Sequence, residues 1–280
     1  MISEIVHGLP FDEYRARPGL SISQLKEMAR SPLHYRHALG SRKETPALAL
    51  GQAAHCATLE PERFDANYSA WSRRTESGNL APRNGKHWDA FREANASRSI
   101  ITEDQHAEAL GIRDAVRAHP EAMKYLRTGS AEVSMFWGFN GRQCRGRIDW
   151  LHESDEIGTA LVGLKSTRDC RQKPFGWQAE RLMYHLQWAF YWDGWRALCG
   201  MMPDRVVEIC VEPKPPHAVA VYRIPDEVLQ RGAEEYMALL EILDECERAN
   251  RWPGPNETEQ DLILPSRDYE DIEAMEYVDE

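Results

Sequence analysis

The fold is decided by two neighbouring runs, Gly146-Arg147-Ile148-Asp149-Trp150 and Ala160-Leu161-Val162-Gly163-Leu164-Lys165-Ser166-Thr167. Both runs are short and apolar, both end in polar or charged residues, and turn residues separate them, so the pair predicts a β-hairpin. Asp149 closes the first strand. Because side chains alternate between the two faces of a strand, Gly163 and Lys165 share one face of the second strand.

An aromatic helix is expected after this hairpin. Tyr184, Gln187 and Tyr191 are spaced i, i+3 and i+7, which places them on one stripe of that helix. The sequence therefore predicts that a carboxylate, a lysine and a glutamine/tyrosine stripe meet at one concave edge.

This combination resembles the PD-(D/E)xK nuclease superfamily. The superfamily core has an Asp, then a second acid, one residue and a Lys, and after these a helix with Gln-x-x-x-Tyr, here Gln187 to Tyr191. Within the superfamily the chain looks most like the RecE-type exodeoxyribonucleases (exodeoxyribonuclease VIII) of phage and prophage recombination systems. The resemblance implies an α/β fold in which helices flank a central mixed β-sheet, with N-terminal helical decoration. The chain departs from the family pattern at Gly163, where the family has Asp or Glu.

Outside the hairpin, the sequence predicts further helices and strands. Apolar spacing and capping residues indicate helices over residues 21–29, 46–59, 102–119, 121–126 and 225–250. Alternating apolar runs indicate strands over residues 132–137, 142–150, 206–211 and 219–224, and Asn140-Gly141 is a typical hairpin turn. Residues 1–19 are expected to be irregular. We expect a single domain over residues 1–255 and an acidic C-terminal tail over residues 256–280.

The composition, with 42% hydrophobic and 28% charged residues, is typical of a globular protein. No run approaches the roughly 18–20 apolar residues of a membrane span, and the N-terminus lacks the plan of a signal peptide. The six cysteines form no C-x-x-C pair, so reduced thiols and a cytoplasmic location are expected. The net charge of -11 counts mildly against a nucleic-acid partner. Bound cations would offset it at the site, and much of the acidity lies in the tail.

One histidine is a candidate metal ligand. Gly51 and His55 lie one turn apart in the helix expected over residues 46–59. Glycine costs roughly 1 kcal/mol there against alanine, which suggests a close backbone approach. A lone histidine on an apolar helix is usually a core residue. RecE-like enzymes carry a Gly-x-x-x-His whose histidine binds metal, so the resemblance implies that His55 is a ligand.

Asp149 and Lys165 form the expected catalytic centre. Hard divalent cations prefer oxygen ligands, so Asp149 is a candidate ligand for Mg²⁺, with Mn²⁺ as a substitute, although alone it would more often cap a strand. Lys165 is expected to orient the attacking water and to offset negative charge, unless it merely snorkels from a strand end. The resemblance also implies the backbone carbonyl of Leu164 as a ligand. Gln187 and Tyr191 should brace the lysine or contact DNA phosphates, with Tyr184 beside them.

Gly163 leaves the expected site one carboxylate short. Three explanations are open. The chain is an inactive variant, or it is a natural DNA-binding pseudonuclease, or another acid has moved into the site. The candidates for a displaced acid are Glu132, Asp155, Glu156 and Glu180. Of the three, the sequence-based interpretation favours an inactive variant.

Two groups of basic residues are candidates for DNA contacts. Arg73, Arg74, Arg83 and Lys86 lie in a stretch rich in Ser, Gly, Asn and Pro, which predicts a flexible basic loop. Arg145 and Arg147 share a strand face that leads to Asp149. Solvated surface cations are the alternative for both groups.

The resemblance implies a Mg²⁺-dependent exodeoxyribonuclease that degrades one strand of double-stranded DNA from its ends, 5′ to 3′. It also implies a homo-oligomeric ring and a single-strand annealing protein as partner. No iron–sulfur cluster is expected, because the cysteines that ligate one in related nucleases are missing, and no membrane partner is expected. A non-catalytic DNA-end-binding pseudonuclease is the alternative. A metabolic α/β enzyme is disfavoured because no glycine-rich nucleotide loop is found.

Overall fold

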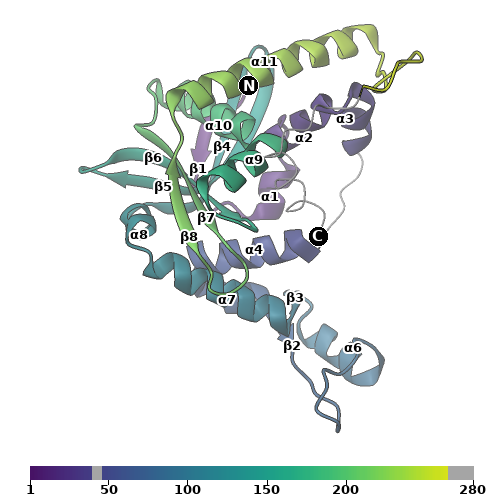
Figure 1. Cartoon of the computed structure of the whole chain (residues 1–280), viewed down its shortest axis with the longest axis vertical. Helices are drawn as coiled ribbons and strands as arrows, with labels where there is room; N and C mark the ends of the chain where they lie inside the picture. The colour runs from purple at the N-terminus through teal and green to yellow at the C-terminus, as the bar shows by residue number, and fades with distance from the viewer. Residues whose placement is uncertain (40–45, 264–280) are drawn as a thin grey trace.

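The central element of the computed structural model, which describes residues 1–39 and 46–263, is a six-stranded mixed β-sheet (Figure 1). Its order is β1-β4-β5-β6-β7-β8. Strands β6 and β7 run parallel, and the other neighbours run antiparallel. The strands are β1 (Glu4–Val6), β4 (Ser130–Phe139), β5 (Arg142–Ser154), β6 (Gly158–Ser166), β7 (Arg205–Val211) and β8 (Val219–Arg223).

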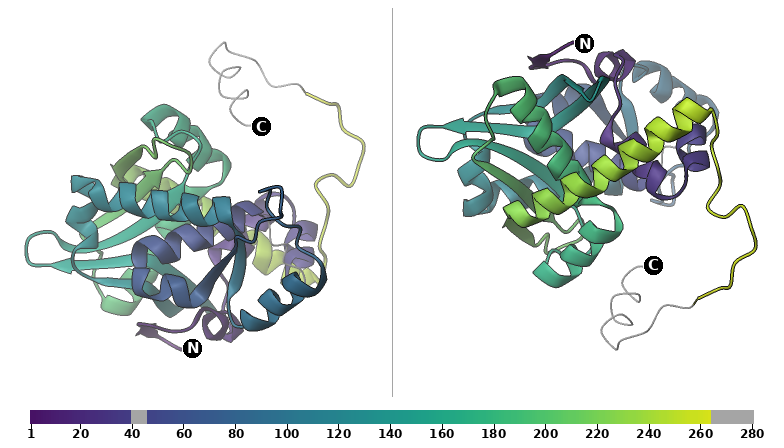
Figure 2. Two further views of the ribbon diagram at one scale, coloured as in Figure 1. Left: turned by 90° about the horizontal axis from the view of Figure 1, so that it is seen from below. Right: turned by 90° about the horizontal axis from the view of Figure 1, so that it is seen from above.

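Helices cover both faces of this sheet. On one face α4 and α7 lie side by side, and on the other α11 runs across α10 (Figure 2). The helices are α1 (Phe11–Ala16), α2 (Ile22–Leu25), the 3₁₀ turn η1 (Lys26–Ala29), α3 (Pro32–Ala38), α4 (Pro46–Leu59), α5 (Pro61–Asn67), α6 (Gly85–Ala94), α7 (Glu103–Ala118), α8 (Pro120–Leu126), α9 (Gln172–Arg181), α10 (Tyr184–Cys199) and α11 (Asp226–Ala249). The predicted fold class, a mixed sheet flanked by helices, is confirmed.

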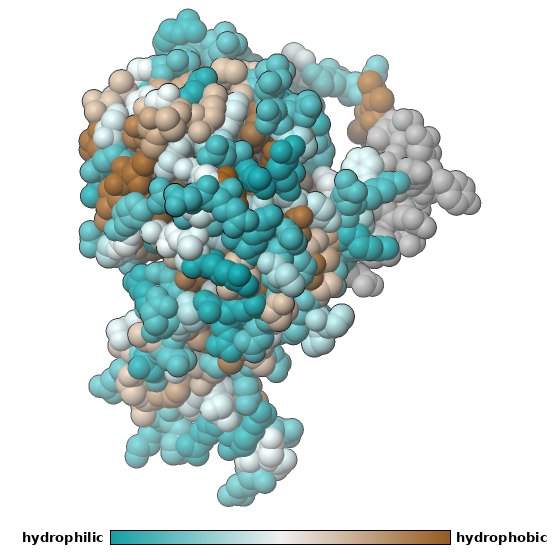
Figure 3. All heavy atoms as spheres, turned by 90° about the vertical axis from the view of Figure 1, so that its left-hand side faces the viewer, coloured by the Kyte–Doolittle hydropathy of each residue, from teal (hydrophilic) through white to brown (hydrophobic). Residues whose placement is uncertain are grey.

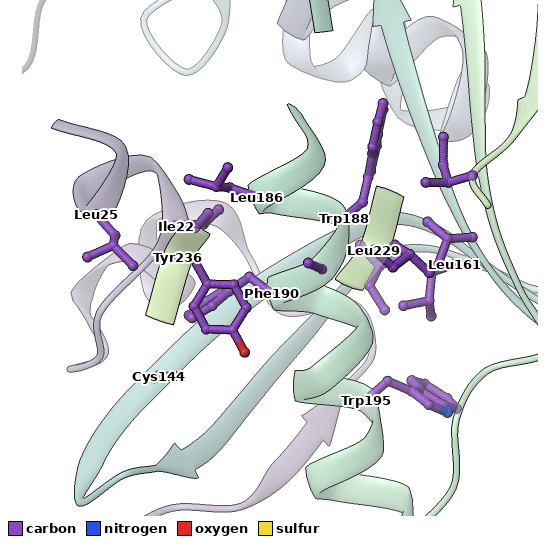
Figure 4. Close-up of a cluster of buried hydrophobic side chains, with 14 of the residues drawn as sticks. Ile22, Leu25, Cys144, Leu161, Leu186, Trp188, Phe190, Trp195, Leu229 and Tyr236 are labelled. Carbon is purple, nitrogen blue, oxygen red and sulfur yellow. The ribbon is translucent and has the colours of Figure 1, made fainter. Parts of the chain in front are cut away.

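Two hydrophobic clusters hold these layers together, one on each face of the sheet. The α10 face is filled by large side chains (Figure 4), among them Ile22, Leu25, Leu161, Leu186, Trp188, Phe190, Trp195, Leu229 and Tyr236. On β7, Val207, Ile209 and Val211 pack toward α4 and α7, whereas Val206 and Cys210 pack toward α10. Glu208 shares the α10 face with Val206 and Cys210 because strand residues two apart point the same way.

Local signals in the sequence explain where several helices and strands begin or end. Asn140 and Gly141 both adopt positive φ values, 46° and 77°, which suits the twist of the two-residue turn between β4 and β5. Thr102 and Gln105 form a capping box at the start of α7. Gly200 ends α10 in the left-handed conformation that glycine adopts without steric cost.

A small arm extends from the body below α7 (Figure 1). It contains the parallel pair β2 (Tyr68–Trp71) and β3 (Ser99–Thr102) together with α6. The ring of Trp71 contacts those of Trp88 and Phe91, with centroids 5.4 and 5.0 Å away. The lower end of the face in Figure 3, where the arm lies, is mostly hydrophilic.

The structure differs from the sequence-based expectation at several places. The expectation of an irregular N-terminus was wrong: β1 and α1 occupy part of residues 1–19, because β1 pairs with the edge of β4. The stretch predicted as a flexible basic loop, which holds Arg73, Arg74, Arg83 and Lys86, is only partly a loop, since Lys86 lies on α6. Helices α5, α6 and α9 and the strand pair β2 and β3 were not predicted. In the tail, residues 256–263 form no helix or strand, and residues 264–280 lie outside the described residues.

Among residues 1–39 and 46–263, no helix has both the length and the apolar character needed to cross a membrane.

Candidate functional site

The site is built where strands β5 and β6 diverge. Their backbone pairing runs from Ser154 opposite Gly158 to Trp150 opposite Val162. One residue further, the Asp149 carboxylate accepts a hydrogen bond from the Leu164 N–H, at 2.9 Å from Oδ2 to N. A side chain thus replaces the backbone acceptor of β5. Because a strand residue's N–H and C=O point to the same side, the Leu164 carbonyl faces the same opening.

The pairing of β5 with its other neighbour, β4, is also interrupted at Asp149. Strands β4 and β5 pair at Ala131–Trp150 and at Val133–Ile148, so Glu132 and Asp149 stand between two ladder pairs. Glu132 has a φ of 54°, an uncommon value for a residue with a Cβ and one often found at functional sites. Its half-buried carboxylate accepts a hydrogen bond from the Arg147 guanidinium, at 2.5 Å from Oε2 to Nε. Burial and the charge of Asp149 raise the pKa of Glu132.

Lys165 and His55 reach Asp149 from two different elements. Lys165 Nζ, from β6, lies 3.4 Å from Asp149 Oδ2, and His55 Nδ1, from α4, lies 4.0 Å from the same oxygen. Burial alone would raise the pKa of Asp149, but Lys165, His55 and the Leu164 N–H outweigh it and hold the pKa below its ordinary value. Burial would likewise lower the pKa of Lys165, but Asp149 and Glu208 outweigh it and raise the pKa. The predicted convergence of imidazole, carboxylate and ammonium is therefore present.

A buried acid that the sequence-based interpretation did not consider, Glu208, completes this group. It lies on β7 directly opposite Gly163, and its side chain is fully buried. The Trp188 indole N–H donates to Glu208 Oε2 at 2.6 Å, and Lys165 Nζ lies 3.9 Å from Oε1. Burial raises the pKa of Glu208. A signal was available, because Glu208 is the one charged residue inside the apolar run from Val206 to Val211.

Gly163 provides the space that Glu208 occupies. A Cβ atom at position 163 would lie 2.4 Å from Glu208 Oε1 and 2.6 Å from Oε2, closer than van der Waals contact allows. Beside it is a cavity of about 20 Å³, enough for roughly one water molecule. Its walls include Asp149, Gly163, Lys165, Gln187, Tyr191 and Glu208.

The four acids suggested by the sequence occupy different places. Asp155 and Glu156 form the turn of the β5–β6 hairpin, six or more residues from Asp149 along the strand. Glu180 pairs with Arg231 on the surface. Only Glu132, of these four, is an immediate neighbour of Asp149, and it is already bound to Arg147.

Helix α10 contributes the aromatic and amide side of the cavity. Gln187 and Tyr191 line it, as their predicted stripe required. The Tyr191 ring packs on Gly146, where a Cβ would lie 2.7 Å from Tyr191 Cε1. Burial raises the pKa of Tyr191. The Tyr184 ring lies beneath Lys165, with Nζ 5.8 Å from its centroid.

Lys26 is a second lysine at the same ring, and sequence reasoning missed it. Its Nζ lies 5.4 Å from the Tyr184 centroid and donates to the Leu182 carbonyl at 3.0 Å. Burial, with a further contribution from Lys165, lowers the pKa of Lys26 to about 7. No pattern in the sequence distinguishes Lys26 from a surface lysine of a short helix.

The predicted DNA-binding residues separate into two groups. Arg73, Arg74, Arg83 and Lys86 are exposed on the arm; Arg74 pairs with Glu103, and Arg83 stacks over Trp88. Arg145 and Arg147 instead face the N-terminal segment. Arg145 donates to the carbonyls of Tyr14, Arg15 and Arg17, and Arg147 donates to that of Leu9. Both strand arginines therefore hold the N-terminal segment against β5 through hydrogen bonds. A DNA contact for them stays a prediction.

Gly51 differs from expectation. A Cβ built on Gly51 would have no atom of another described residue within 4 Å. The expectation of a close backbone approach at Gly51 was therefore wrong. His55 nevertheless faces the site, because the α4 helix lies over the divergence of β5 and β6.

The donor set fits a hard divalent cation. Two carboxylates, a backbone carbonyl and an imidazole surround the opening, and Glu208 Oε1 is buried without a hydrogen-bond partner among the described residues. Within residues 1–39 and 46–263, no three His, Cys, Asp or Glu side chains are already gathered as a ligand group. The Lys165 ammonium lies between the two carboxylates, 3.4 Å from Asp149 Oδ2 and 3.9 Å from Glu208 Oε1.

Comparison with known proteins gives a family and a related fold. The family model described as a PDDEXK-like domain of unknown function (DUF3799) matches residues 21–261. A crystal structure from Eubacterium rectale described as a "putative exonuclease" is 14% identical, with a TM-score of 0.63, and the match covers 95% of this chain and 98% of that one. The structure of SSO0001 is also 14% identical and covers 78% of this chain and 85% of that one, but its TM-score of 0.29 is too low to support an argument. No curated protein matches the sequence.

Proposed function

Because this chain belongs to the PDDEXK-like domain family, we propose that it is a divalent-metal-dependent deoxyribonuclease. The observation that supports this most directly is the meeting of His55, Asp149 and Lys165 at one opening of the sheet. His55 comes from α4, far before the β5–β6 hairpin that carries Asp149 and Lys165, and the Leu164 backbone lies among them. Such a mixture of carboxylate, imidazole and buried ammonium suits phosphodiester hydrolysis better than it suits structural support.

Each side chain has a distinct task in this proposal. Asp149, His55 and the Leu164 carbonyl would hold the cation, which supplies positive charge to the phosphoryl oxygen and lowers the pKa of a bound water. Lys165 would hold the attacking water in line with phosphorus and donate to a non-bridging oxygen. Gln187 and Tyr191 would fix the position of the lysine from the α10 side.

The finer assignment follows the resemblance to RecE-type enzymes. We propose degradation of linear double-stranded DNA from its ends in the 5′-to-3′ direction, with Mg²⁺ as cation, in a phage or prophage recombination system. A homo-oligomeric ring around the duplex and a single-strand annealing protein as partner belong to the same proposal. The Eubacterium rectale structure supports only the fold in this assignment. Its sequence is 14% identical to this chain, which is too low to support a shared activity.

The test uses purified full-length chain, Mg²⁺ and three DNA substrates. Linear duplex labelled at the 5′ end, the same duplex labelled at the 3′ end and a closed circle separate exonuclease from endonuclease and report the direction. Asp149→Asn and Lys165→Met should lower the rate by at least about 10²-fold, because each removes a group that acts on the reacting phosphate. Glu121→Gln, on the surface of α8, is the control. Absence of cleavage of every substrate with Mg²⁺ and Mn²⁺ would contradict the proposal.

A second candidate is a non-catalytic protein that binds DNA ends. The observation in its favour is the Lys165 ammonium, which lies 3.4 Å from Asp149 Oδ2 and 3.9 Å from Glu208 Oε1 and so offsets part of the negative charge of both carboxylates by itself. Binding of a duplex end with equal affinity in Mg²⁺ and in a chelator, together with absence of cleavage, would favour this candidate.

A further inference from the structure

The position of Glu208 relative to Gly163 is set by the parallel register of β6 and β7. The two residues are direct partners, and Lys165 pairs with Cys210 two positions later. Gly163 and Lys165 therefore lie on the same face as Glu208 and Cys210. Neighbouring strands are about 4.8 Å apart, a distance that a glutamate side chain can span.

The carboxylate of Glu208 lies where a side chain at position 163 would begin. All three atoms nearest to a Cβ built on Gly163 belong to this carboxylate, Oε1 at 2.4 Å, Oε2 at 2.6 Å and Cδ at 2.8 Å. An interior strand glycine often marks the close approach of another group. Here the approaching group is a carboxyl group, the same group that the family pattern places at position 163.

The environment of Glu208 is unusual for a residue with only a structural role. Oε2 accepts from the Trp188 indole at 2.6 Å, which fixes the orientation of the carboxylate. Oε1 has no hydrogen-bond partner among the described residues, and the Lys165 ammonium lies 3.9 Å from it. Glu208 lines the cavity together with Asp149 and Lys165. A buried carboxylate oxygen that accepts no hydrogen bond destabilises a fold, and such groups are often explained by function.

We propose that Glu208 is the second acidic ligand of the metal site, delivered from β7 into the space that Gly163 leaves open. This inference rests on the proposed nuclease function. It replaces the sequence-based preference for an inactive variant, and it names an acid outside the four considered there. Glycine at position 163 is then a requirement of the site, because any larger residue would displace the Glu208 carboxylate.

Calorimetric titration of the full chain with Mn²⁺ tests the proposal without relying on activity. Glu208→Gln keeps the shape and the acceptor for Trp188 but removes the negative charge. We expect this variant to bind Mn²⁺ at least about tenfold more weakly than the unsubstituted chain, since even outer-shell partners contribute this much to metal affinity. Asp149→Asn should weaken binding similarly.

The matched control is Asp193→Asn. Asp193 is a buried acid on α10 that accepts from Tyr236 Oη at 2.6 Å and does not line the cavity. Its substitution should leave Mn²⁺ affinity unchanged. If Glu208→Gln binds Mn²⁺ as tightly as the unsubstituted chain, the ligand role is overturned while the nuclease proposal stands. If the unsubstituted chain binds no Mn²⁺, both are overturned.

Moving the acidic residue from position 208 to position 163 gives a second test, which does not depend on whether Glu208→Gln folds well. Gly163→Asp alone should lower stability and fail to strengthen Mn²⁺ binding, because its Cβ meets Glu208. Combined with Glu208→Ala, the same aspartate gains the vacated space and should bind Mn²⁺ more tightly than Glu208→Ala alone, a non-additivity expected for residues in contact. If the double variant binds Mn²⁺ no more tightly than Glu208→Ala, the proposal that the two side chains can place a carboxylate at the same point is contradicted.

Discussion

At the scale of single residues, Gly163 and Glu208 show that a motif position and a chemical group are separable. The family pattern places an acid on the strand that also carries the lysine. In this chain the strand carries glycine, and a carboxylate from the neighbouring strand occupies the resulting space. What matters for a cation is where the oxygen atoms lie, and two adjacent strands can deliver an oxygen to the same point.

Lys26 leads to a prediction about pH. Burial lowers the pKa of Lys26 from 10.5 to about 7, so between these values the unfolded chain binds more protons than the folded one. The free energy of unfolding contributed by this group therefore rises with pH in that window. From about pH 7 to about pH 9, urea unfolding should show a larger gain in stability for the unsubstituted chain than for Lys26→Met.

The comparison of the two pH profiles identifies the group responsible. Lys86→Met, on the exposed surface of α6, serves as control and should follow the unsubstituted chain. Identical profiles for Lys26→Met and the unsubstituted chain would show that Lys26 is not the group that titrates.

At the scale of elements, the interface between α10 and α11 positions the cavity wall. Gln187 and Tyr191 lie on α10, whose other side packs on α11 through Gly232 and Tyr236. A Cβ on Gly232 would lie 2.2 Å from the His185 carbonyl oxygen, so the two helices approach as closely as a glycine permits.

Gly232→Ala should therefore separate α10 from α11. We expect a loss of about 1–3 kcal/mol in the free energy of unfolding, as for other overpacked interiors, together with weaker Mn²⁺ binding as Gln187 and Tyr191 shift. Gly51→Ala is the control, because the space around its Cβ is open and alanine favours the helix by up to about 1 kcal/mol. Equal stability of the two variants in thermal or urea unfolding would contradict this close packing.

At the scale of the whole molecule, the distribution of charge indicates where a DNA duplex would bind under the proposed function. The chain has a formal net charge of -11, yet Arg73, Arg74, Arg83 and Lys86 are gathered on the arm that extends from the body (Figure 1). Association with a polyanion is favoured where positive charge is concentrated, even on an acidic protein. The arm is thus the surface at which we expect the duplex to be held.

Substitution of Arg73, Arg83 and Lys86 together by glutamine should weaken DNA binding in a salt-dependent way. The slope of log affinity against log salt should become shallower by about 0.9 for each phosphate that the protein no longer neutralises. Fluorescence anisotropy with a labelled duplex in a chelator measures this without cleavage. Arg231→Gln, on the exposed side of α11, is the control. Parallel salt plots for the triple variant and the unsubstituted chain would exclude the arm as a DNA-binding surface.

The sequence by itself determined five of the six strands of the main sheet, several of the helices and the motif residues. Alternation and turn residues specified the β5–β6 hairpin, and helical spacing specified the stripe of Gln187 and Tyr191, because both patterns are local and repeat within a few residues. Asp149, Lys165 and His55 were identified through motif spacing. Their meeting in space agrees with that identification.

Only the tertiary structure decided which second carboxylate, besides Asp149, lies near Lys165. Glu208 follows Gly163 by 45 positions, and nothing local to either residue predicts that β6 and β7 pair in parallel with these two residues opposite each other. The same holds for Lys26, which burial against Tyr184 turns from an ordinary lysine into one with a pKa of about 7. Register and burial are consequences of long-range packing, and side-chain chemistry at this site depends on both.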